Sequence, residues 1–439
     1  MPGERRMRAV MGQDAREAGP MRMTEFLRAE WRPSLGCTEP AAVAWAAALA
    51  AEQGSGRVLG ARLVCDPRTY KNCYAVGLPN SGRATGILWA LALGAHLPDS
   101  SLGLRSFEGT GPASIEAARD LLERHGVQVE VAPRQGSLLV DVTVEREQGV
   151  GRAVLTLEHT HLARLERDGR LVGGADSAQR PEGGPSLRQA AAARSIVELM
   201  ALARTIGPED RERLRRGAEL NLAMARHGLS LLPAGFVGPS GQDAQTRLAR
   251  LVSAGVHARM SGAALTVMTL AGSGNKGITV SVPVSLWGRE AGHPQERVDE
   301  ALAFACLMAS ATTWHLGTLS AVCGAANAGG IGIASALVFL EGGDARQVGL
   351  AVANMVGNVA GMICDGAKIG CAMKSMTGVD AAFRASGLAL AGIGIPSSDG
   401  IVGEDGESCL VNLGRLAQQG MAGVDAEILR IMQDKLARA

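Results

Sequence analysis

The stretch ICDGAKIGCAMK (residues 363–374) places two cysteines, Cys364 and Cys371, seven positions apart. In one continuous helix these positions would share a face but lie about 10.5 Å apart, which is too far for one small metal centre. Gly366 and Gly370 give the backbone the freedom to curl and to bring both thiols to one point. The stretch therefore predicts a glycine-containing loop that interrupts a helical region.

Cys323, in the upstream motif LSAVCG, supplies a third thiol. Iron–sulfur clusters normally take four thiolates, so three candidate ligands suggest a cluster with one iron left open to substrate. An open iron can act as a Lewis acid. The alternative is that the three cysteines are small buried hydrophobes in a Gly/Ala-rich core. On spacing alone, this alternative is the more common case.

The composition favours a small-molecule role. With 439 residues the chain can bury a large core and is long enough for two domains. Lys+Arg 44 against Asp+Glu 43 leaves a net charge of +1, with no electrostatic footprint for nucleic acid or an anionic membrane. The 58 glycines and 3% aromatic residues favour close backbone packing and loops that approach a ligand.

The cysteine content and the N-terminus indicate a reducing cytoplasm. Eight cysteines are too few for a disulfide scaffold in a chain of this length. Residues 1–22 are charged and lack the apolar segment of a secretory signal. Residues 316–340 are uncharged, as in a membrane span, but their Gly, Ser and Asn327 weaken insertion. We expect a buried helix pair there, split at Gly329 and Gly330.

The pattern of hydrophobic residues predicts an α+β fold in two parts. We expect a disordered extension at residues 1–23, a small α+β domain with an antiparallel sheet at residues 24–175, and a larger, mainly α-helical catalytic domain at residues 185–439. Alternating polar and apolar residues predict strands at 58–65, 127–131, 138–145 and 152–165. Helical periodicity predicts helices at 186–206, 209–227, 244–261, 296–314, 345–363, 380–390 and 424–436.

The motif SLGCTEP (residues 34–40) places a thiol, a hydroxyl and a carboxylate in succession ahead of an Ala-rich helix. Pro40 suits a first helical turn, so Cys37 is expected just before a helix N-terminus. The partial positive charge there should lower the pKa of the thiol and favour the thiolate. Cys37 could then accept a proton in catalysis or serve as a fourth cluster ligand. Thr38 and Glu39 beside it are candidate substrate contacts.

The motif GSGNKG (residues 272–277) matches the dinucleotide fingerprint G-x-G-x-x-G, but its context is wrong for that role. A helix should follow, whereas residues 278–284 are β-branched and contain Pro283. A loop whose backbone N–H groups hold a small carboxylate fits better, and a simple tight turn is the alternative. The candidate substrate contacts in this loop are Gly272, Ser273, Gly274 and Asn275.

Two further pairs are candidates for the same pocket. His159 and His161 are expected within a strand, where side chains two positions apart share a face, although a structural or exposed pair is the more common case. Lys71 and Asn72 lie beside a predicted turn, where a charge and an amide could hold a carboxylate. An exposed lysine explains that pair equally well.

With these residues assembled, the chain resembles the iron–sulfur L-cysteine desulfidase family, the single-chain relatives of iron–sulfur L-serine dehydratase alpha subunits. The resemblance runs from about residue 34 to the C-terminus and implies that Cys323, Cys364 and Cys371 hold a [4Fe–4S] cluster and that Cys37 is the catalytic base or thiol. The motifs that carry it, in matching order and spacing, are SLGCTEPAAVA, YKNCYAVGLP, EHTH, AGSGNKGI, LSAVCGAANAGG, NVAGMICDGAKIGCAMK and DGIVGEDGESCLVNLG.

The activity that the resemblance implies is β-elimination from L-cysteine, giving sulfide, ammonia and pyruvate. L-serine or another β-substituted amino acid is the alternative substrate. The chain departs from the family at His257, where Asp is usual, at Lys276, where Gln is usual, and at residues 314–318, where basic residues are missing. These departures leave open a non-catalytic protein that binds a small carboxylate. The expected partners are a small amino-acid substrate and a second copy in a homodimer, with no nucleic acid and no membrane.

Overall fold

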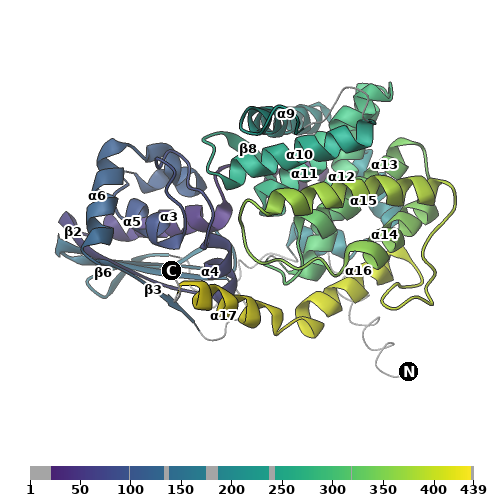
Figure 1. Ribbon diagram of the computed structural model, residues 1–439. Coiled ribbons are helices and arrows are strands. Elements are labelled where there is room, and N and C mark those ends of the chain that lie inside the picture. The colour runs from purple at the N-terminus through teal and green to yellow at the C-terminus, as the bar shows by residue number, and fades with distance from the viewer. Residues whose placement is uncertain are drawn as a thin grey trace.

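The computed structural model describes residues 21–97, 99–132, 138–174, 186–236, 243–317 and 319–436. A sheet with three covering helices forms the N-terminal part, and a large helical assembly forms the C-terminal part (Figure 1). The predicted α+β class is therefore confirmed. Residues 1–20 of the expected extension at residues 1–23, and the stretch 175–185 between the expected domains, lie outside the described residues. Met21 and Met23 are buried, and Met23 begins a helix.

The N-terminal part is built on a six-stranded sheet with the order β3-β2-β4-β5-β6-β7. Only β2 and β3 pair in parallel, and the other neighbours are antiparallel. The expected single strand at 152–165 is wrong, because a turn at 157–161 divides it into β5 and β6. The strands are β2 (Ser55–Cys65), β3 (Val127–Val131), β4 (Leu139–Gln148), β5 (Val150–Thr156), β6 (Leu162–Arg167) and β7 (Arg170–Gly173).

Small residues hold the Ala-rich helix α3 (Thr38–Ala51) close to this sheet. A Cβ atom on Gly151 of β5 would lie 1.9 Å from the carbonyl oxygen of Ala50. A Cβ atom on Gly94 of α5 (Ile87–Gly94) would lie 2.5 Å from that of Ala44. Together with α6 (Pro112–Glu123), these helices cover one face of the sheet (Figure 1). The packing fixes the N-terminus of α3, where Cys37 lies.

The C-terminal part is a helical assembly around α13, in which every residue is buried. Its expected helices are present, except that residues 186–206 form two helices. The last helix has the predicted bounds 424–436, the helices expected to begin at 244 and 345 begin there, and the other helices have at least one shifted end. The helices of this part are α7 (Leu187–Ala192), α8 (Ile196–Ala203), α9 (Pro208–Ser230), α10 (Ala244–Met260), α11 (Gly274–Glu290), α12 (Gln295–Leu316), α13 (Gly330–Leu340), α14 (Ala345–Val359), α15 (Cys371–Leu390), α16 (Gly406–Arg415) and α17 (Val424–Leu436).

The expected helix break at Gly329 and Gly330 is wrong. Both glycines have helical dihedral angles, and a π-helical turn, η2 (Ala325–Gly329), continues directly into α13. Gly330 serves close packing instead, because a Cβ atom there would lie 2.5 Å from Cε of Met355. No helix among the residues that the structure describes has the length and apolar character needed to cross a membrane.

A second correction concerns residues 278–284, which lie inside helix α11 rather than in an extended segment. These β-branched residues and Pro283 are all buried. The preceding strand β8 (Thr266–Leu270) pairs antiparallel with β1 (Trp31–Leu35), so the loop does not belong to a parallel strand–helix–strand unit. Burial outweighs the helix propensity of these residues, which differs from that of alanine by only some tenths of a kcal/mol for β-branched side chains.

The two ends of the described chain cross between the parts. The N-terminal helix α2 (Met23–Glu30) and β1 pack into the helical part, where the indole of Trp31 donates to the carbonyl of Arg213 at 3.2 Å. The C-terminal helix α17 returns to the N-terminal part and lies beside α4 (Pro67–Cys73) (Figure 1). The helical part thus packs against the N-terminal segment, and the N-terminal part packs against the C-terminal helix.

The contact between α17 and α4 is a buried ion pair. Lys71 is 1% exposed, and its ammonium donates to the carboxylate of Asp425 at 2.5 Å and to the carbonyl of Cys364 at 2.7 Å. Arg68 donates to the other oxygen of Asp425 at 2.8 Å. Burial alone would raise the pKa of Asp425, but Lys71 and Arg68 more than offset it, so that the pKa lies below its ordinary value.

Replacing Asp425 by Asn should lower the free energy of unfolding by about 3 kcal/mol, because it leaves the Lys71 ammonium buried without its counter-charge. Urea denaturation measures the change, with the exposed Asp434→Asn on the same helix as the control. The lowered pKa of Asp425 means that the pair stabilises the fold above about pH 3.9 and that this stabilisation is lost as the pH falls below it. Equal unfolding midpoints for the two variants would contradict this role.

Candidate active site

A cavity of about 100 Å³ lies where the N-terminal part, the β1–β8 ribbon and the helical part meet. It brings together most of the residues singled out in the sequence. The three candidate ligands Cys323, Cys364 and Cys371 line it, and so do Cys37, Thr38, Glu39, Asn72, His159, Gly272, Ser273 and Asn275.

Several helices begin at this cavity. Cys37 is the N-cap of α3, Ser273 is the N-cap of α11, and Cys371 is the first residue of α15. The carbonyl of Cys323 accepts from the backbone N–H of Asn327 as η2 begins. Helix N-termini carry partial positive charge and unpaired N–H groups, so the wall of the cavity favours anions.

The β1–β8 pairing joins the Cys37 turn to the GSGNKG loop. Thr38 Oγ1 donates to the carbonyl of Gly272 at 3.2 Å. Arg259 of α10 donates to the carbonyl of Gly36 at 2.6 Å and to the side-chain oxygen of Asn275 at 2.8 Å. Two segments more than 230 positions apart are thereby held in one wall.

Backbone contacts bring the candidate ligand cysteines together. The N–H of Cys323 donates to the carbonyl of Met362 at 2.8 Å, and the N–H of Cys364 donates to that of Ala321 at 2.7 Å. Gly366 then turns the chain with φ of +96°, and the thiol of Cys371 lies 3.4 Å from its carbonyl oxygen. The expected curl between Cys364 and Cys371 is therefore present.

Two of the three candidate ligand thiols have raised pKa values. Burial raises the pKa of Cys323 to about 12, and the neighbouring Cys364 and Cys371 raise it as well. Burial also raises the pKa of Cys371. Within the described part of the chain, no three His, Cys, Asp or Glu side chains are close enough to hold a single metal ion. In a cluster each thiolate bonds a different iron, so cluster ligands need not be that close.

The expected thiolate at Cys37 is wrong for the protein without a ligand. Burial and the Glu39 carboxylate raise the pKa of the Cys37 thiol well above its ordinary value, and Arg259 offsets them only in part. The thiol donates to Glu39 Oε2 at 3.1 Å, and Asn72 donates to Glu39 Oε1 at 3.1 Å. The helix N-terminus is present, but desolvation outweighs it at a side chain that is 4% exposed.

The two histidines do not share a face, because they lie in the turn between β5 and β6. His159 lines the cavity; burial lowers its pKa, and its Nε2 atom has no hydrogen-bond partner. His161 contacts Thr156 instead, with 3.4 Å between Nδ1 and Oγ1. His159 is therefore a neutral imidazole with one free nitrogen.

Lys71 and Gly274 are not among the residues that line the cavity. The Lys71 ammonium is bound in the ion pair with Asp425. Gly274 packs on Arg259, since a Cβ atom there would lie 2.4 Å from its Nε atom.

Two buried cations in the wall were not expected from the sequence as site residues. Arg259 is 2% exposed and Lys276 is 3% exposed. The Lys276 ammonium donates to the carbonyl of Ala271 at 2.8 Å and to Thr313 Oγ1 at 3.0 Å. In the sequence, Arg259 could have been identified as a charge on an otherwise apolar face of α10. Lys276 could have been identified by its departure from the family pattern.

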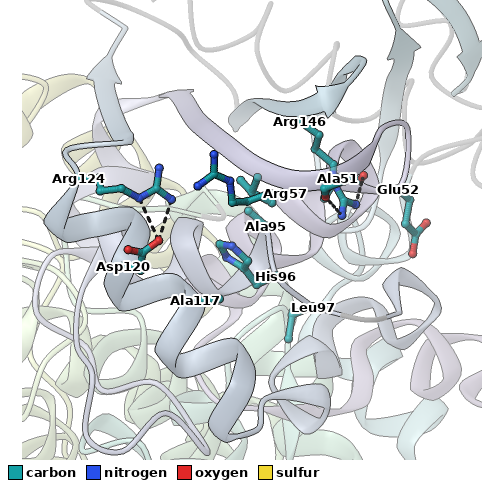
Figure 2. A pocket seen from close by; sticks show the side chains of 12 residues that line it. Ala51, Glu52, Arg57, Ala95, His96, Leu97, Ala117, Asp120, Arg124 and Arg146 are labelled. Carbon is teal, nitrogen blue, oxygen red and sulfur yellow. Dashed lines mark hydrogen bonds and ion pairs between the residues drawn. The ribbon is translucent and has the colours of Figure 1, made fainter.

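A larger cavity, of about 460 Å³, lies in the N-terminal part (Figure 2). Arg124 is paired there with Asp120, and Arg146 donates to the carbonyl of Ala51 at 3.0 Å. None of the candidate site residues lines it. The chemistry therefore belongs to the smaller cavity, which gathers the thiols and the charged residues.

The chain is similar to known proteins over most of its length. The family described as "Serine dehydratase alpha chain" matches residues 164–430. A UPF0597 protein of Oleidesulfovibrio alaskensis is 39% identical over 432 residues, which cover 94% of this chain and 98% of that protein. UPF0597 proteins of Geobacter sulfurreducens and Elusimicrobium minutum are 35% and 31% identical, each over 94% of this chain and 98% and 99% of their own lengths.

The thiol-lined cavity at the helix N-termini is thus the candidate site of a lyase-like protein. The chain belongs to the serine dehydratase alpha chain family. The names of these relatives specify no cysteine desulfidase activity.

Replacing Gly366 by Ala should displace the loop that carries the candidate ligands. A Cβ atom there would lie 2.2 Å from the carbonyl oxygen of Lys71, and φ of +96° is strained for any L side chain. The strain alone costs about 1–3 kcal/mol. Gly370→Ala in the same loop is the control, because Gly370 has φ of −58° and no contact under 3.4 Å. Thermal unfolding should separate the variants, and a Gly366→Ala protein as stable as Gly370→Ala would refute the packing argument.

Proposed function

We propose that this protein is a [4Fe–4S]-dependent lyase that eliminates the β-substituent of L-cysteine and gives sulfide, ammonia and pyruvate. The observation that carries the proposal is the meeting of Cys323, Cys364 and Cys371 in one cavity with Cys37 and Glu39. Membership of the serine dehydratase alpha chain family supports the reaction class. The free state of all eight cysteines fits the reducing cytoplasm in which we expect the reaction to run.

The donor set fits an iron–sulfur cluster. Burial, and then the neighbouring Cys364 and Cys371, raise the pKa of Cys323, so that ionising this thiol without metal carries a penalty. Bound iron removes that penalty, since it stabilises the thiolate directly. Lys374 and the helix N-termini add positive charge beside them. When bound, a cluster with one open iron supplies a Lewis acid for the substrate.

Cys37 differs from these three in its surroundings. Its thiol is hydrogen-bonded to Glu39, whereas the largest charge effects on the pKa of Cys323 come from Cys364, Cys371 and Lys374. These contacts support a role towards substrate and not as a fourth ligand. In the proposed reaction Glu39 holds the substrate ammonium, and the Cys37 sulfur, once deprotonated, accepts the α-proton.

The remaining side chains position the substrate. Asn72 fixes the Glu39 carboxylate. Gly272 and Ser273 line the cavity at the N-terminus of α11, whose partial positive charge favours the carboxylate of the amino acid. His159, neutral and with Nε2 unpaired, can hydrogen-bond in the cavity without adding charge. The departing aminoacrylate hydrolyses to pyruvate and ammonia in water.

L-serine is the alternative substrate, because it differs from L-cysteine by one atom. A soft sulfur suits an open iron in a thiolate-bound cluster, which supports cysteine. The family description supports serine. Comparing kcat/KM for both on one cluster-loaded preparation decides the choice, and serine ahead by about tenfold, or 1.4 kcal/mol, would reverse it.

Anaerobic reconstitution with iron and sulfide should load the wild-type protein with a cluster and start release of pyruvate. Cys364→Ser and Cys371→Ser should lose the cluster, because each removes a thiolate ligand. Cys306→Ser and Cys409→Ser are matched controls, since both thiols are fully buried elsewhere. Iron and sulfide analysis measures the result. A wild-type protein that takes up no iron under argon would rule the proposal out.

Cys37→Ala should keep the cluster and stop exchange of the substrate α-proton into deuterated water. Because the pKa of the thiol is raised, wild-type kcat/KM should also increase with pH and still be increasing at about pH 9. Electron paramagnetic resonance of the reduced cluster is the control measurement. A changed spectrum in Cys37→Ala without substrate would identify Cys37 as a ligand instead.

A further inference from the structure

Lys276 is a buried cation without a carboxylate partner in the wall of the candidate active site. Its ammonium has two hydrogen-bond acceptors, the carbonyl of Ala271 and the hydroxyl of Thr313, and both are neutral. Across the described residues, no carboxylate oxygen lies within 4 Å of this nitrogen. Since an ammonium has three N–H donors, one remains for a ligand.

Without a counter-charge nearby, the charged form of Lys276 is disfavoured. Burial, and then the positive charge of Arg188 on α7, lower the pKa of Lys276 to about 7. Glu30 on α2, Glu39 on α3 and Cys323 before η2 act in the opposite direction but do not compensate. A buried ammonium becomes favourable when an anion pairs with it, so an anionic ligand would stabilise its charged form.

The charges around the cavity match a zwitterion. Arg259 and Lys276 both line it, and neither is ion-paired within the described part of the chain. Glu39 supplies a carboxylate on the α3 side, held by Cys37 and Asn72. An α-amino acid carries a carboxylate and an ammonium on the same carbon, which fits cations and an anion in the wall of one small cavity.

We propose that Lys276 binds the α-carboxylate of the amino acid in this cavity while Glu39 receives its ammonium. This inference rests on the proposed function and adds the residue that recognises the acid group. Lys276 is in the first turn of α11, so the positive end of the helix acts on the same carboxylate. The lysine is therefore a substrate-binding residue of this chain, where the family pattern has an uncharged glutamine.

The test compares L-serine with L-serinamide, which has no carboxylate, on cluster-free protein. Isothermal titration at about pH 6.5 keeps the ligand amines protonated. The wild-type protein should bind L-serine at least tenfold more tightly than the amide. Lys276→Gln should reduce this preference to about onefold while leaving the affinity for the amide unchanged, because glutamine can still donate to Ala271 and Thr313. Lys435→Gln, at an exposed position on α17, is the control and should keep the wild-type preference.

Equal affinity of the wild-type protein for the two ligands would overturn the inference without any variant. A Lys276→Gln protein that loses both ligands equally would also overturn it, since the lysine would then be structural. Lys276→Met, similar in length and uncharged, gives a second variant should the glutamine protein fail to fold. The two proposals can fail separately. If the cluster-loaded wild-type protein releases no pyruvate, the proposed lyase activity is refuted, while loss of the carboxylate preference in Lys276→Gln would still support the inference.

Discussion

The buried ammonium of Lys71 ties together three segments that are distant in the sequence. It binds Asp425 of the last helix and the carbonyl of Cys364 in the thiol loop, while its own backbone belongs to α4 of the N-terminal part. Because the ammonium is withdrawn from water, both partners must be in place for its charge to be compensated. The position of a candidate ligand loop thus depends on the docking of the N-terminal part and of α17.

Small residues then allow the helix ends to meet around the cavity. A Cβ atom on Gly77 would lie 2.4 Å from the backbone of Ser261, and one on Gly378 would lie 2.7 Å from that of Ala326. Such contacts are possible only for glycine, so close backbone packing accounts for part of the high glycine content. The closeness of the backbones is what brings several positive helix ends to so small a space.

Periodicity in the sequence was sufficient for the fold class and for most helices, since both depend on local pattern. It failed for α11, because the buried position of Pro283 and its β-branched neighbours depends on helices far away in the chain. The motifs led to the residues that line the cavity, but not to their ionisation. The helix N-terminus beside Cys37 was predictable, whereas the burial and the Glu39 contact that reverse the expected pKa shift are tertiary. Lys71 was predicted as a substrate contact, and its burial in the ion pair with Asp425 is tertiary in the same way.

The charges of the cavity depend on one another. Thr313 and Ala271 accept two of the three hydrogen bonds of Lys276 and do not compensate its charge, and the hydrogen-bond partners of Arg259 among the described residues, Gly36 and Asn275, are likewise neutral. The same positive wall that makes these cations costly lowers the cost of ionising nearby thiols. A site that is to hold three thiolates and a carboxylate therefore gains from unpaired cations that would only destabilise an ordinary core. The two buried cations therefore fit the proposed binding of anions in this cavity.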